Sequence, residues 1–282
     1  MPELPEVETV RKGLSQLVVG KTIIKVEVYW PRIIESPGVT AFCQELQDQT
    51  IEKIHRRGKY LIFQLSDYEM ISHLRMEGKY EFFAEKNEVR RDKHTHVIFY
   101  LTDGSQLHYN DVRKFGRLTL LAKGSSQLYK GIAQLGPEPV HESFHLADFQ
   151  KRLKQSTMLI KPLLLNQKVV AGLGNIYTDE VLWLAQIHPQ QPASTLTKKE
   201  TDRLYQAIIE VLAKAVTAGG TTVRSYKNAL GSAGHFQVEL NVYGKTGQPC
   251  PRCQSPIEKI KVAQRGTHFC PHCQKLRRRK LK

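Results

Sequence analysis

Apolar side chains recur every three or four positions near the amino terminus, and after Gly20 they recur at every second position. The first pattern predicts a helix over residues 5–19. The second predicts a half-buried strand whose apolar face holds Ile24, Val26, Val28 and Trp30. A short helix is also expected over residues 40–47.

Strand-like runs continue as far as residue 121. They cover residues 60–65, 96–101, 106–109 and 117–121, and Asp103-Gly104 is typical of a hairpin turn between two of them. Several short strands separated by turn signals indicate a β-sandwich or barrel, with the first helix packed on it.

The pattern becomes helical after residues 135–139, where two prolines and a glycine indicate a domain boundary. Helices are predicted over residues 143–155, 157–167, 178–187 and 197–218, and Thr197 with Glu200 forms a capping box at the start of the last one. Strands followed by helices predict an α+β fold.

Four of the five cysteines follow a C-x2-C-x16-C-x2-C spacing: Cys250, Cys253, Cys270 and Cys273. This spacing predicts one structural zinc ion, because four thiolates complete a tetrahedron and leave no open position. A redox role is the alternative, although redox pairs rarely come twice at this spacing. The fifth cysteine, Cys43, is expected to be a small buried apolar residue.

The charge of the chain indicates a polyanionic partner, and nucleic acid above others. The chain has 42 lysines and arginines against 27 acidic residues, which gives a net charge of +15. Residues 245–282 hold eleven basic residues and one acid, and the last eight residues are expected to form a flexible basic arm. No apolar run suits a membrane helix and no secretory leader is apparent, so a cytoplasmic, nucleoid-associated protein without membrane contact is expected.

The first eight residues carry candidate chemistry. If Met1 is removed, Pro2 becomes a terminal secondary amine that can attack a sugar aldehyde carbon and form a cationic iminium. Glu3 and Glu6 then supply carboxylates within one helical turn for proton transfer. The alternative is an ordinary helix start, where proline and acidic residues are both favoured.

Three segments of the first half place cations beside glycines at strand ends. Residues 56–60 hold three cations around Gly58, which suits either a solvated strand edge or a phosphate contact with Lys59 near a reacting sugar. In residues 73–78 and 111–116, Met76 and Phe115 either plug the core or enter a base stack and fill the hole left by an extruded base.

Segments of the second half also allow two interpretations. Residues 172–177 form either a simple helix–helix turn or a phosphate site at a helix start. Lys161 is a lone cation in an apolar helix, as a snorkelling surface lysine would be. Residues 219–235 lack periodicity and suit a lid over a bound base. Arg265 falls near a predicted hairpin tip, where it reaches phosphate or belongs to a plain turn.

Taken in order, these segments resemble the bacterial formamidopyrimidine-DNA glycosylase family along nearly the whole chain. Each motif alone is weak, but their joint order is specific. The matching motifs are residues 2–9, 57–59, 73–78, 111–116, 174–177 and 264–267 together with the four paired cysteines.

The resemblance implies three domains and a repair reaction. The domains are a catalytic β-sandwich over 1–135, a helix–two-turns–helix DNA-binding domain over 136–236, and a zinc finger with basic tail over 237–282. The implied activity removes oxidised purines such as 8-oxoguanine and formamidopyrimidines and then nicks the strand by β,δ-elimination. The implied partner is double-stranded DNA with oxidised purines or abasic sites, bound by a monomer.

The resemblance also implies residue roles. Pro2 is the nucleophile at the sugar C1′, Glu3 transfers protons, and Lys59 and Arg265 grip phosphates beside the lesion. The implied DNA-binding residues are His73, Met76, Arg113, Lys114, Phe115, Lys161 and Asn175. Of these, Met76, Arg113 and Phe115 fill the gap in the duplex. The implied contacts to the flipped base are Glu6, Arg224 and Tyr226.

Two other functions stay open at this point. The related endonuclease VIII type prefers oxidised pyrimidines and usually begins with a sequence resembling Pro-Glu-Gly-Pro-Glu, whereas Leu4 and Pro5 here favour purines. A non-catalytic zinc-ribbon protein would bind intact DNA in a salt-sensitive way and form no covalent product.

Overall fold

A computed structural model of the chain describes residues 1–84, 91–221 and 239–277. Contacts divide these residues into two units. The first unit holds Met1–Gln134 and, of the described residues, 218–221. The second unit holds Leu135–Thr217 and the described residues 239–277. Within the described ranges, no helix has both the length and the apolar character needed to cross a membrane.

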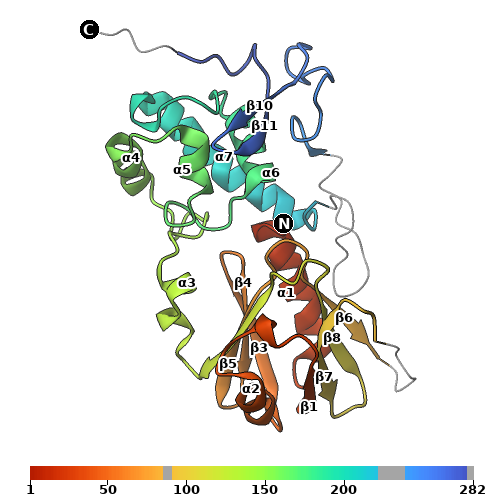
Figure 1. Ribbon diagram of the computed structural model, residues 1–282. Helices are drawn as coiled ribbons and strands as arrows, with labels where there is room; N and C mark the ends of the chain where they lie inside the picture. Colours follow the sequence, from red (N-terminus) through yellow and green to blue (C-terminus); the bar gives the residue numbers. More distant parts are fainter. Residues whose placement is uncertain (85–90, 222–238, 278–282) are drawn as a thin grey trace. The chain divides into compact units, whose positions relative to one another are not determined.

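The first unit consists of two sheets and the helix α1 (Leu4–Val18), as Figure 1 shows. The four-stranded antiparallel sheet has the order β1 (Ile23–Val28), β7 (Thr95–Leu101), β8 (Gln106–Asn110) and β6 (Lys79–Phe83). The five-stranded sheet has the order β2 (Ile34–Ser36), β9 (Arg117–Ala122), β5 (Tyr68–His73), β4 (Tyr60–Leu65) and β3 (Ile51–Arg57). Only the short β2 runs parallel to its neighbour among these described strands.

Short helical segments complete the first unit. They are η1 (Pro31–Ile33), α2 (Val39–Leu46), η2 (Ser126–Leu128) and α3 (Lys130–Ala133). The predicted helix over residues 40–47 is therefore confirmed as α2.

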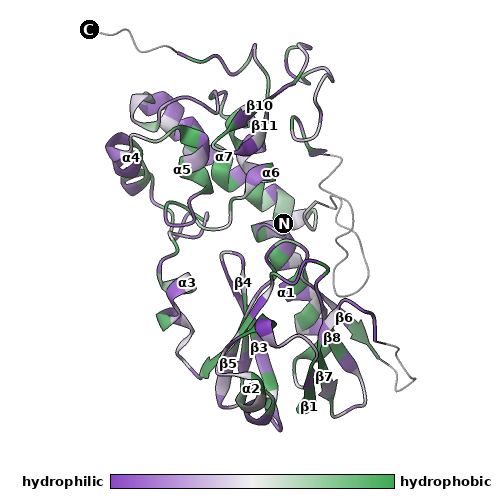
Figure 2. Ribbon diagram, viewed as in Figure 1, coloured by the Kyte–Doolittle hydropathy of each residue, from purple (hydrophilic) through white to green (hydrophobic). Residues whose placement is uncertain are grey.

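One hydrophobic core joins α1 to both sheets. The inward face of α1 is 0–1% exposed and is formed by Val7, Val10, Leu14 and Val18. Figure 2 shows apolar residues recurring along α1 and along the neighbouring strands. The spacing that predicted this helix is thus the spacing of its buried face.

The strand β1 corrects the predicted apolar face. Its register against β7 shifts between Ile23 and Lys25, and this bulge breaks the alternation of faces. Ile23 is therefore 1% exposed and Val26 7% exposed, whereas Ile24 is 47% exposed. Strands β2, β3, β5 and β6 were not predicted, and charged residues in β3 and β6 hide the period of two.

The second unit is helical and ends in a hairpin. Its elements are α4 (Leu146–Gln155), α5 (Ile160–Leu165), α6 (Asn175–Leu184), η3 (Ala193–Thr195), α7 (Lys198–Thr217), β10 (Glu258–Val262) and β11 (Arg265–Phe269). The predicted capping box of α7 is confirmed, because Glu200 accepts the Thr197 backbone N–H at 2.8 Å and the Glu200 N–H bonds to Thr197 Oγ1 at 3.3 Å. The α+β class is confirmed; the division into three domains stays a prediction.

The bulge in β1 generates a matched test of the core. We expect Ile23→Ala to lower the free energy of unfolding by about 2–5 kcal/mol, because it leaves a cavity in the core. Ile24→Ala should change it by less than about 0.5 kcal/mol, because that side chain faces solvent. Urea denaturation of both variants measures the difference, and equal losses would show that the bulge is misplaced.

Candidate active site and nucleic-acid interface

Two buried carboxylates organise the start of α1. Glu3 is the N-cap residue and forms a reciprocal capping box with Glu6, whose Oε2 accepts the Glu3 N–H at 2.8 Å. The two residues are 2% and 4% exposed, and Pro2 is also buried. The predicted nucleophile and proton-transfer group therefore stand at the fixed end of a core helix rather than on a loose terminus.

The second oxygen of Glu6 holds the segment that follows α7. Glu6 Oε1 accepts the backbone N–H of Thr221 at 2.7 Å and the Thr221 hydroxyl at 3.1 Å. Gly220, with φ of +79°, lies so close that an added Cβ would come within 2.8 Å of the same oxygen. Glu6 thus anchors the approach to the predicted base-binding loop. Arg224 and Tyr226, the other predicted base contacts, lie outside the described residues.

An ion-pair chain connects α1 to the hairpin that carries Lys59. Glu8 bonds Arg11 at 2.7 Å and Arg56 at 3.0 Å. Burial alone would raise the pKa of Glu8, but the hydrogen bonds and charges of Arg11 and Arg56 lower it overall. Arg56 also donates to the carbonyl of Gly58 at 2.9 Å, and Gly58 has a φ of 57° that favours glycine. Lys59 is 6% exposed and is therefore held at a defined place in the turn.

His73 is fixed as a neutral donor. Its Nδ1 accepts the backbone N–H of Arg75 at 2.9 Å, which places the ring proton on Nε2. Burial, followed by the charges of Arg75 and Lys59, lowers the pKa of His73 to about 3. The ring also packs edge-on against Tyr60, with centroids 4.6 Å apart. A neutral Nε2–H can donate to a phosphate without changing charge near pH 7.

Asp111 shapes the loop that carries Phe115. Its carboxylate accepts three backbone N–H groups, from Arg113 at 3.0 Å, Phe115 at 2.8 Å and Gly116 at 2.7 Å. Asp111 is 1% exposed whereas Phe115 is 47% exposed, so a buried anion presents a solvent-facing aromatic ring. The guanidinium of Arg113 lies 4.7 Å from the centre of that ring. The role of Asp111 was not predicted from the sequence. The signal is that aspartate side chains often bond the backbone N–H two residues further on, as in an Asx turn.

Lys114 occupies the same loop with a φ of 59°. Its ammonium lies 4.1 Å from the centre of the Trp30 ring. Lys114, which is predicted to contact DNA, is exposed and lies next to the aromatic side chain of Trp30.

The amino terminus and the exposed loops line one pocket. A cavity of about 410 Å³ is lined by Met1, Arg75, Met76, Phe115 and Arg117. Two of the three predicted gap-filling side chains, Met76 and Phe115, thus share a cavity with Met1, the residue that precedes Pro2. Arg75 and Arg117 were not singled out from the sequence as site residues, because arginines at strand ends are common on any surface.

In the second unit, Asn175 opens α6 as predicted for a phosphate site. Gly174 is the N-cap, and Asn175 Nδ2 donates to the carbonyl of Gly266 at 2.9 Å. Among the described residues, Asn175 Oδ1 has no hydrogen-bond partner. The contact with Gly266 places Asn175 beside the hairpin of β10 and β11.

The structure corrects the snorkelling interpretation of Lys161, because its side chain is 0% exposed. The DNA contact implied for Lys161 stays a prediction. Its ammonium donates to Asp179 Oδ1 at 2.7 Å, to Thr267 Oγ1 at 2.8 Å and to the carbonyl of Gly266 at 3.2 Å. Asp179 also accepts the His268 N–H at 2.9 Å. Lys161 therefore ties α5 and α6 to the hairpin.

The hairpin presents Arg265 beside its turn. Ala263 and Gln264, between β10 and β11, have φ of 45° and 63°, and Arg265 pairs with Val262 at the first position of β11. The Arg265 side chain is exposed. Non-glycine residues in this conformation cost energy, so the surrounding contacts must hold the turn.

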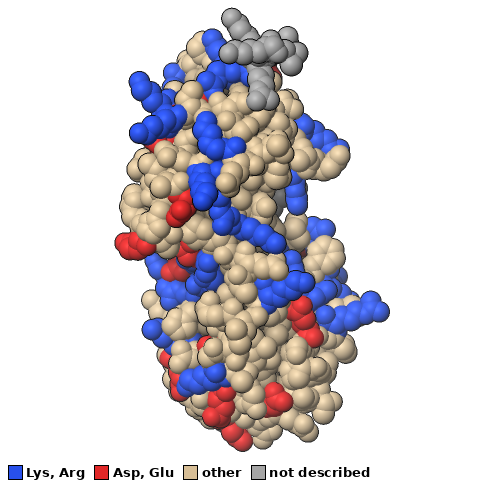
Figure 3. All heavy atoms as spheres, turned by 90° about the vertical axis from the view of Figure 1, so that its left-hand side faces the viewer, with Lys and Arg blue, Asp and Glu red and all other residues tan. Residues whose placement is uncertain are grey.

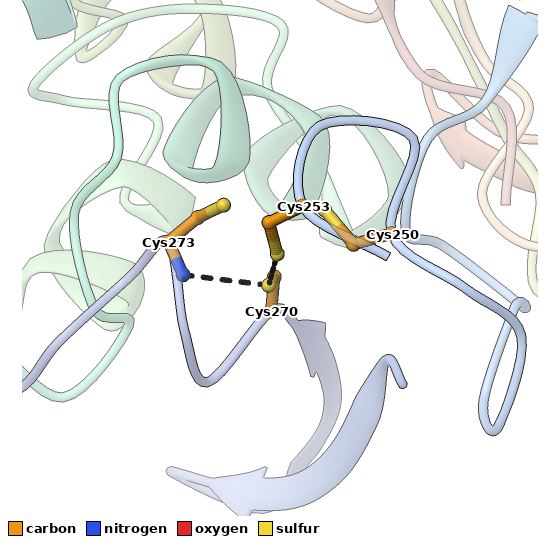
Figure 4. Close-up of side chains that lie close together, drawn as sticks. All are labelled: Cys250, Cys253, Cys270 and Cys273. Atoms are coloured by element: carbon orange, nitrogen blue, oxygen red, sulfur yellow. Dashed lines mark hydrogen bonds between the residues drawn. The ribbon is translucent and has the colours of Figure 1, made fainter. Parts of the chain in front are cut away.

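The four predicted zinc ligands come together at the base of this hairpin (Figure 4). Their sulfurs lie within 4.8 Å of one another, and Cys253 Sγ is 3.4 Å from Cys270 Sγ. Zinc bonds of about 2.3 Å in a tetrahedron require sulfurs about 3.8 Å apart, so the residues fit one structural zinc ion. Trp183 Nε1 donates to Cys250 Sγ at 3.4 Å, a contact typical of the outer shell of such sites.

Lysine and arginine side chains are exposed at many places on the surface drawn in Figure 3. The fold, the exposed cations and aromatics, and the four-cysteine site together define a zinc-containing DNA-binding protein of the α+β class.

Comparison with known proteins narrows this class to a family. Residues 1–118 match the formamidopyrimidine-DNA glycosylase N-terminal domain, residues 135–227 match its H2TH domain, and residues 247–276 match the zinc finger found in FPG and IleRS. The chain is 66% identical to the formamidopyrimidine-DNA glycosylase of Enterococcus faecalis and 55% identical to that of Latilactobacillus sakei, over 100% and 97% of this chain and 100% and 98% of theirs. The chain therefore belongs to the formamidopyrimidine-DNA glycosylase family.

Solved structures agree with this assignment. Lactococcus lactis Fpg, in complex with DNA containing an abasic site, matches with a TM-score of 0.92 and 49% identity, covering 97% of this chain and 99% of that chain. The same protein in complex with DNA containing N7-benzyl-Fapy-dG matches with a TM-score of 0.92 and 49% identity, covering 97% and 100%.

The pKa of His73 generates a stability prediction. Because the folded pKa of about 3 lies below the ordinary value of 6.5, the unfolded chain binds this proton first as pH falls. Stability contributed at His73 is present above the ordinary value and is lost between the two values. We expect wild type to lose more free energy of unfolding between pH 7 and pH 5 than His73→Gln does, measured by urea denaturation. Equal losses in the two proteins would contradict this assignment.

The cysteine cluster generates a second prediction with an internal control. Cys253→Ser should weaken zinc binding by at least about 100-fold, because one of four thiolates is lost. Cys43→Ser should bind zinc as the wild type does, because Cys43 lies outside the cluster. Competition against a chromophoric chelator measures both affinities. Parallel losses in the two variants would exclude the assigned ligand set.

Proposed function

We propose that this chain is a bifunctional DNA glycosylase and abasic-site lyase of base excision repair that removes oxidised purines from double-stranded DNA. One observation carries the proposal: the amino terminus lines the same cavity as Met76 and Phe115. A nucleophile at that place would meet the sugar of a nucleotide that had left the stack. One chain supplies all the residues, so we expect the protein to act on DNA as a monomer. We also expect it to act in the cytoplasm.

The proposed chemistry begins with removal of Met1, because the Pro2 nitrogen is otherwise an amide. The freed amine attacks C1′ as the bond from C1′ to the base breaks, and the base leaves with a proton. The nitrogen lone pair then expels the ring oxygen O4′ from C1′, which takes up a proton, and an iminium ion forms on the opened sugar. Loss of a proton from C2′ expels the 3′ phosphate, and a second elimination through C4′ expels the 5′ phosphate. We assign the proton transfers to Glu3, which is buried beside Pro2.

The proposed phosphate contacts come from groups of both units. Lys59 lies in the turn just before β4, whose first residue Tyr60 pairs with His73 at the end of β5. Arg265 and Asn175 belong to the second unit, where the carbonyl of Gly266 joins them. Cations and N–H donors that hold the backbone on both sides of a lesion would keep the strand bent while the base is extruded.

Two of the proposed gap-filling residues, Arg113 and Phe115, are exposed, and Met76 is partly buried. Phe115 with Arg113 stacked on it, and Met76 beside them in the cavity, offer an apolar wedge with a cation. We assign Lys114 to a further contact with the DNA backbone. We assign Glu6, Arg224 and Tyr226 to recognition of the flipped base, with Glu6 acting by anchoring Thr221 at the start of that segment.

Oxidised purines are favoured over pyrimidines for two reasons. Solved relatives from Lactococcus lactis are complexes with DNA containing Fapy-dG or an abasic site. In addition, Leu4 stands here where the endonuclease VIII pattern has glycine, which distinguishes the chain from that pattern.

Borohydride trapping tests the proposal. With the terminus verified as Pro2 by mass spectrometry, wild type should form a reduced covalent adduct with an 8-oxoguanine duplex. The yield with a thymine-glycol duplex should be at least about tenfold lower. Pro2→Gly should lower excision by about 100-fold or more while binding to a duplex with a tetrahydrofuran site changes less than about threefold.

Each competing function gives a different result in this assay. A non-catalytic DNA-binding protein gives salt-sensitive binding and no adduct with any duplex. An endonuclease VIII-type enzyme gives more adduct with thymine glycol. An adduct mapped to a lysine side chain would reject Pro2 as the nucleophile.

A further inference from the structure

Two loops of the first unit end in glycines that face the same side chain. Residues 73–78 carry Met76 and end at Gly78, and residues 111–116 carry Phe115 and end at Gly116. A Cβ built on either glycine would overlap the hydroxyl of Tyr109. Neither glycine has a positive φ, so space rather than backbone conformation excludes a larger residue at both places.

Tyr109 is held rigidly in β8. It is 0% exposed and pairs with Tyr80 of β6 on one side and Val97 of β7 on the other. Its ring meets that of Tyr80 edge-on, with centroids 5.0 Å apart, and the Tyr80 hydroxyl donates to Ser72 Oγ at 2.8 Å. A ring fixed in this way cannot give way when a loop presses on its tip.

Both glycines also close their loops by hydrogen bonds. Gly78 N–H donates to the carbonyl of Leu74 at 2.9 Å, and Gly116 N–H donates to Asp111 Oδ2 at 2.7 Å. A displacement of Gly78 would therefore shift Met76, and a displacement of Gly116 would shift Phe115. The tip of Tyr109 is the place where the two loops meet the core.

We propose that Tyr109 is a positioning residue that sets the place of Met76 and Phe115 relative to each other, so that both enter the duplex gap together. This inference rests on the proposed function. It predicts that the loops act as one element, and that altering the contact at one glycine impairs extrusion of the base without touching the chemistry at Pro2.

The two glycines offer a matched comparison. At Gly116 the nearest atoms to an added Cβ all belong to Tyr109, with Cζ at 2.8 Å after the hydroxyl. At Gly78 an added Cβ would also come within 2.6 Å of the backbone carbonyl of Leu74, which no side-chain change removes. Tyr109→Phe removes the closest contact at Gly116, which is with the hydroxyl, and leaves Cζ at 2.8 Å, so it should relieve Gly116→Ala in part. It should not relieve Gly78→Ala, because the contact with the carbonyl of Leu74 is unchanged.

The experiment uses two substrates. One is an 8-oxoguanine duplex, which requires a filled gap, and the other is a single-stranded oligonucleotide with an abasic site, which has no stack to enter. We expect Gly116→Ala to slow cleavage of the duplex at least about tenfold and of the single strand less than about twofold. Adding Tyr109→Phe should recover part of the loss, at least about twofold on the duplex, because the closest contact is removed. Tyr109→Leu, which introduces no clash, should slow the duplex alone and serves if Gly116→Ala fails to fold.

The outcomes separate the inference from the proposed function. Absence of rescue in Gly116→Ala/Tyr109→Phe, equal rescue of Gly78→Ala, or equal losses on the two substrates would overturn the inference while wild type still cleaves both. A wild-type chain with a verified Pro2 terminus that cleaves neither substrate would instead refute the proposed function.

Discussion

The packing of α1 into the core of the first unit is the constraint on which the candidate site depends. Its buried face, Val7 to Val18, is 0–1% exposed, and each such side chain contributes about 1.5–3 kcal/mol. Chain termini ordinarily fray, because few contacts offset their conformational entropy. Here the terminus leads directly into a helix that is packed in the core, so Pro2 and Glu3 are held in place by that packing.

Buried carboxylates extend this order to the loops. Asp111 accepts hydrogen bonds from three backbone N–H groups of the loop that carries Phe115, and Glu6 accepts one from the backbone N–H of Thr221. Glu180 accepts the backbone N–H groups of Asn241, Val242 and Tyr243. A charge removed from water is costly unless donors surround it, and each loop supplies those donors only in its observed conformation. The anions are thus a means of fixing irregular backbone in a protein whose exposed surface is predominantly cationic.

Regular elements and the metal ligands were predictable from the sequence, because each rests on a local pattern. The helices α1 and α7 follow from spacing and a capping box, and the zinc ligands follow from cysteine spacing. The exposure of Ile24 was not predictable, because a one-residue bulge leaves no mark on the sequence. Nor was the burial of Lys161, because its partner Asp179 lies on another helix and a lone lysine is ordinarily exposed. Roles that need a tertiary partner escape a reading of local sequence.

The hairpin of β10 and β11 shows why the zinc site and the buried ion pair both matter to Arg265. A two-residue turn with positive φ favours glycine and asparagine, but Ala263 and Gln264 occupy it at a cost of about 1–2 kcal/mol each. A two-stranded ribbon is only marginally stable alone. Zinc binding of about 10 kcal/mol exceeds that cost, and Lys161 and Asn175 both bond the carbonyl of Gly266, the residue next to Arg265. The metal therefore stabilises the ribbon, while these two donors hold the backbone next to Arg265.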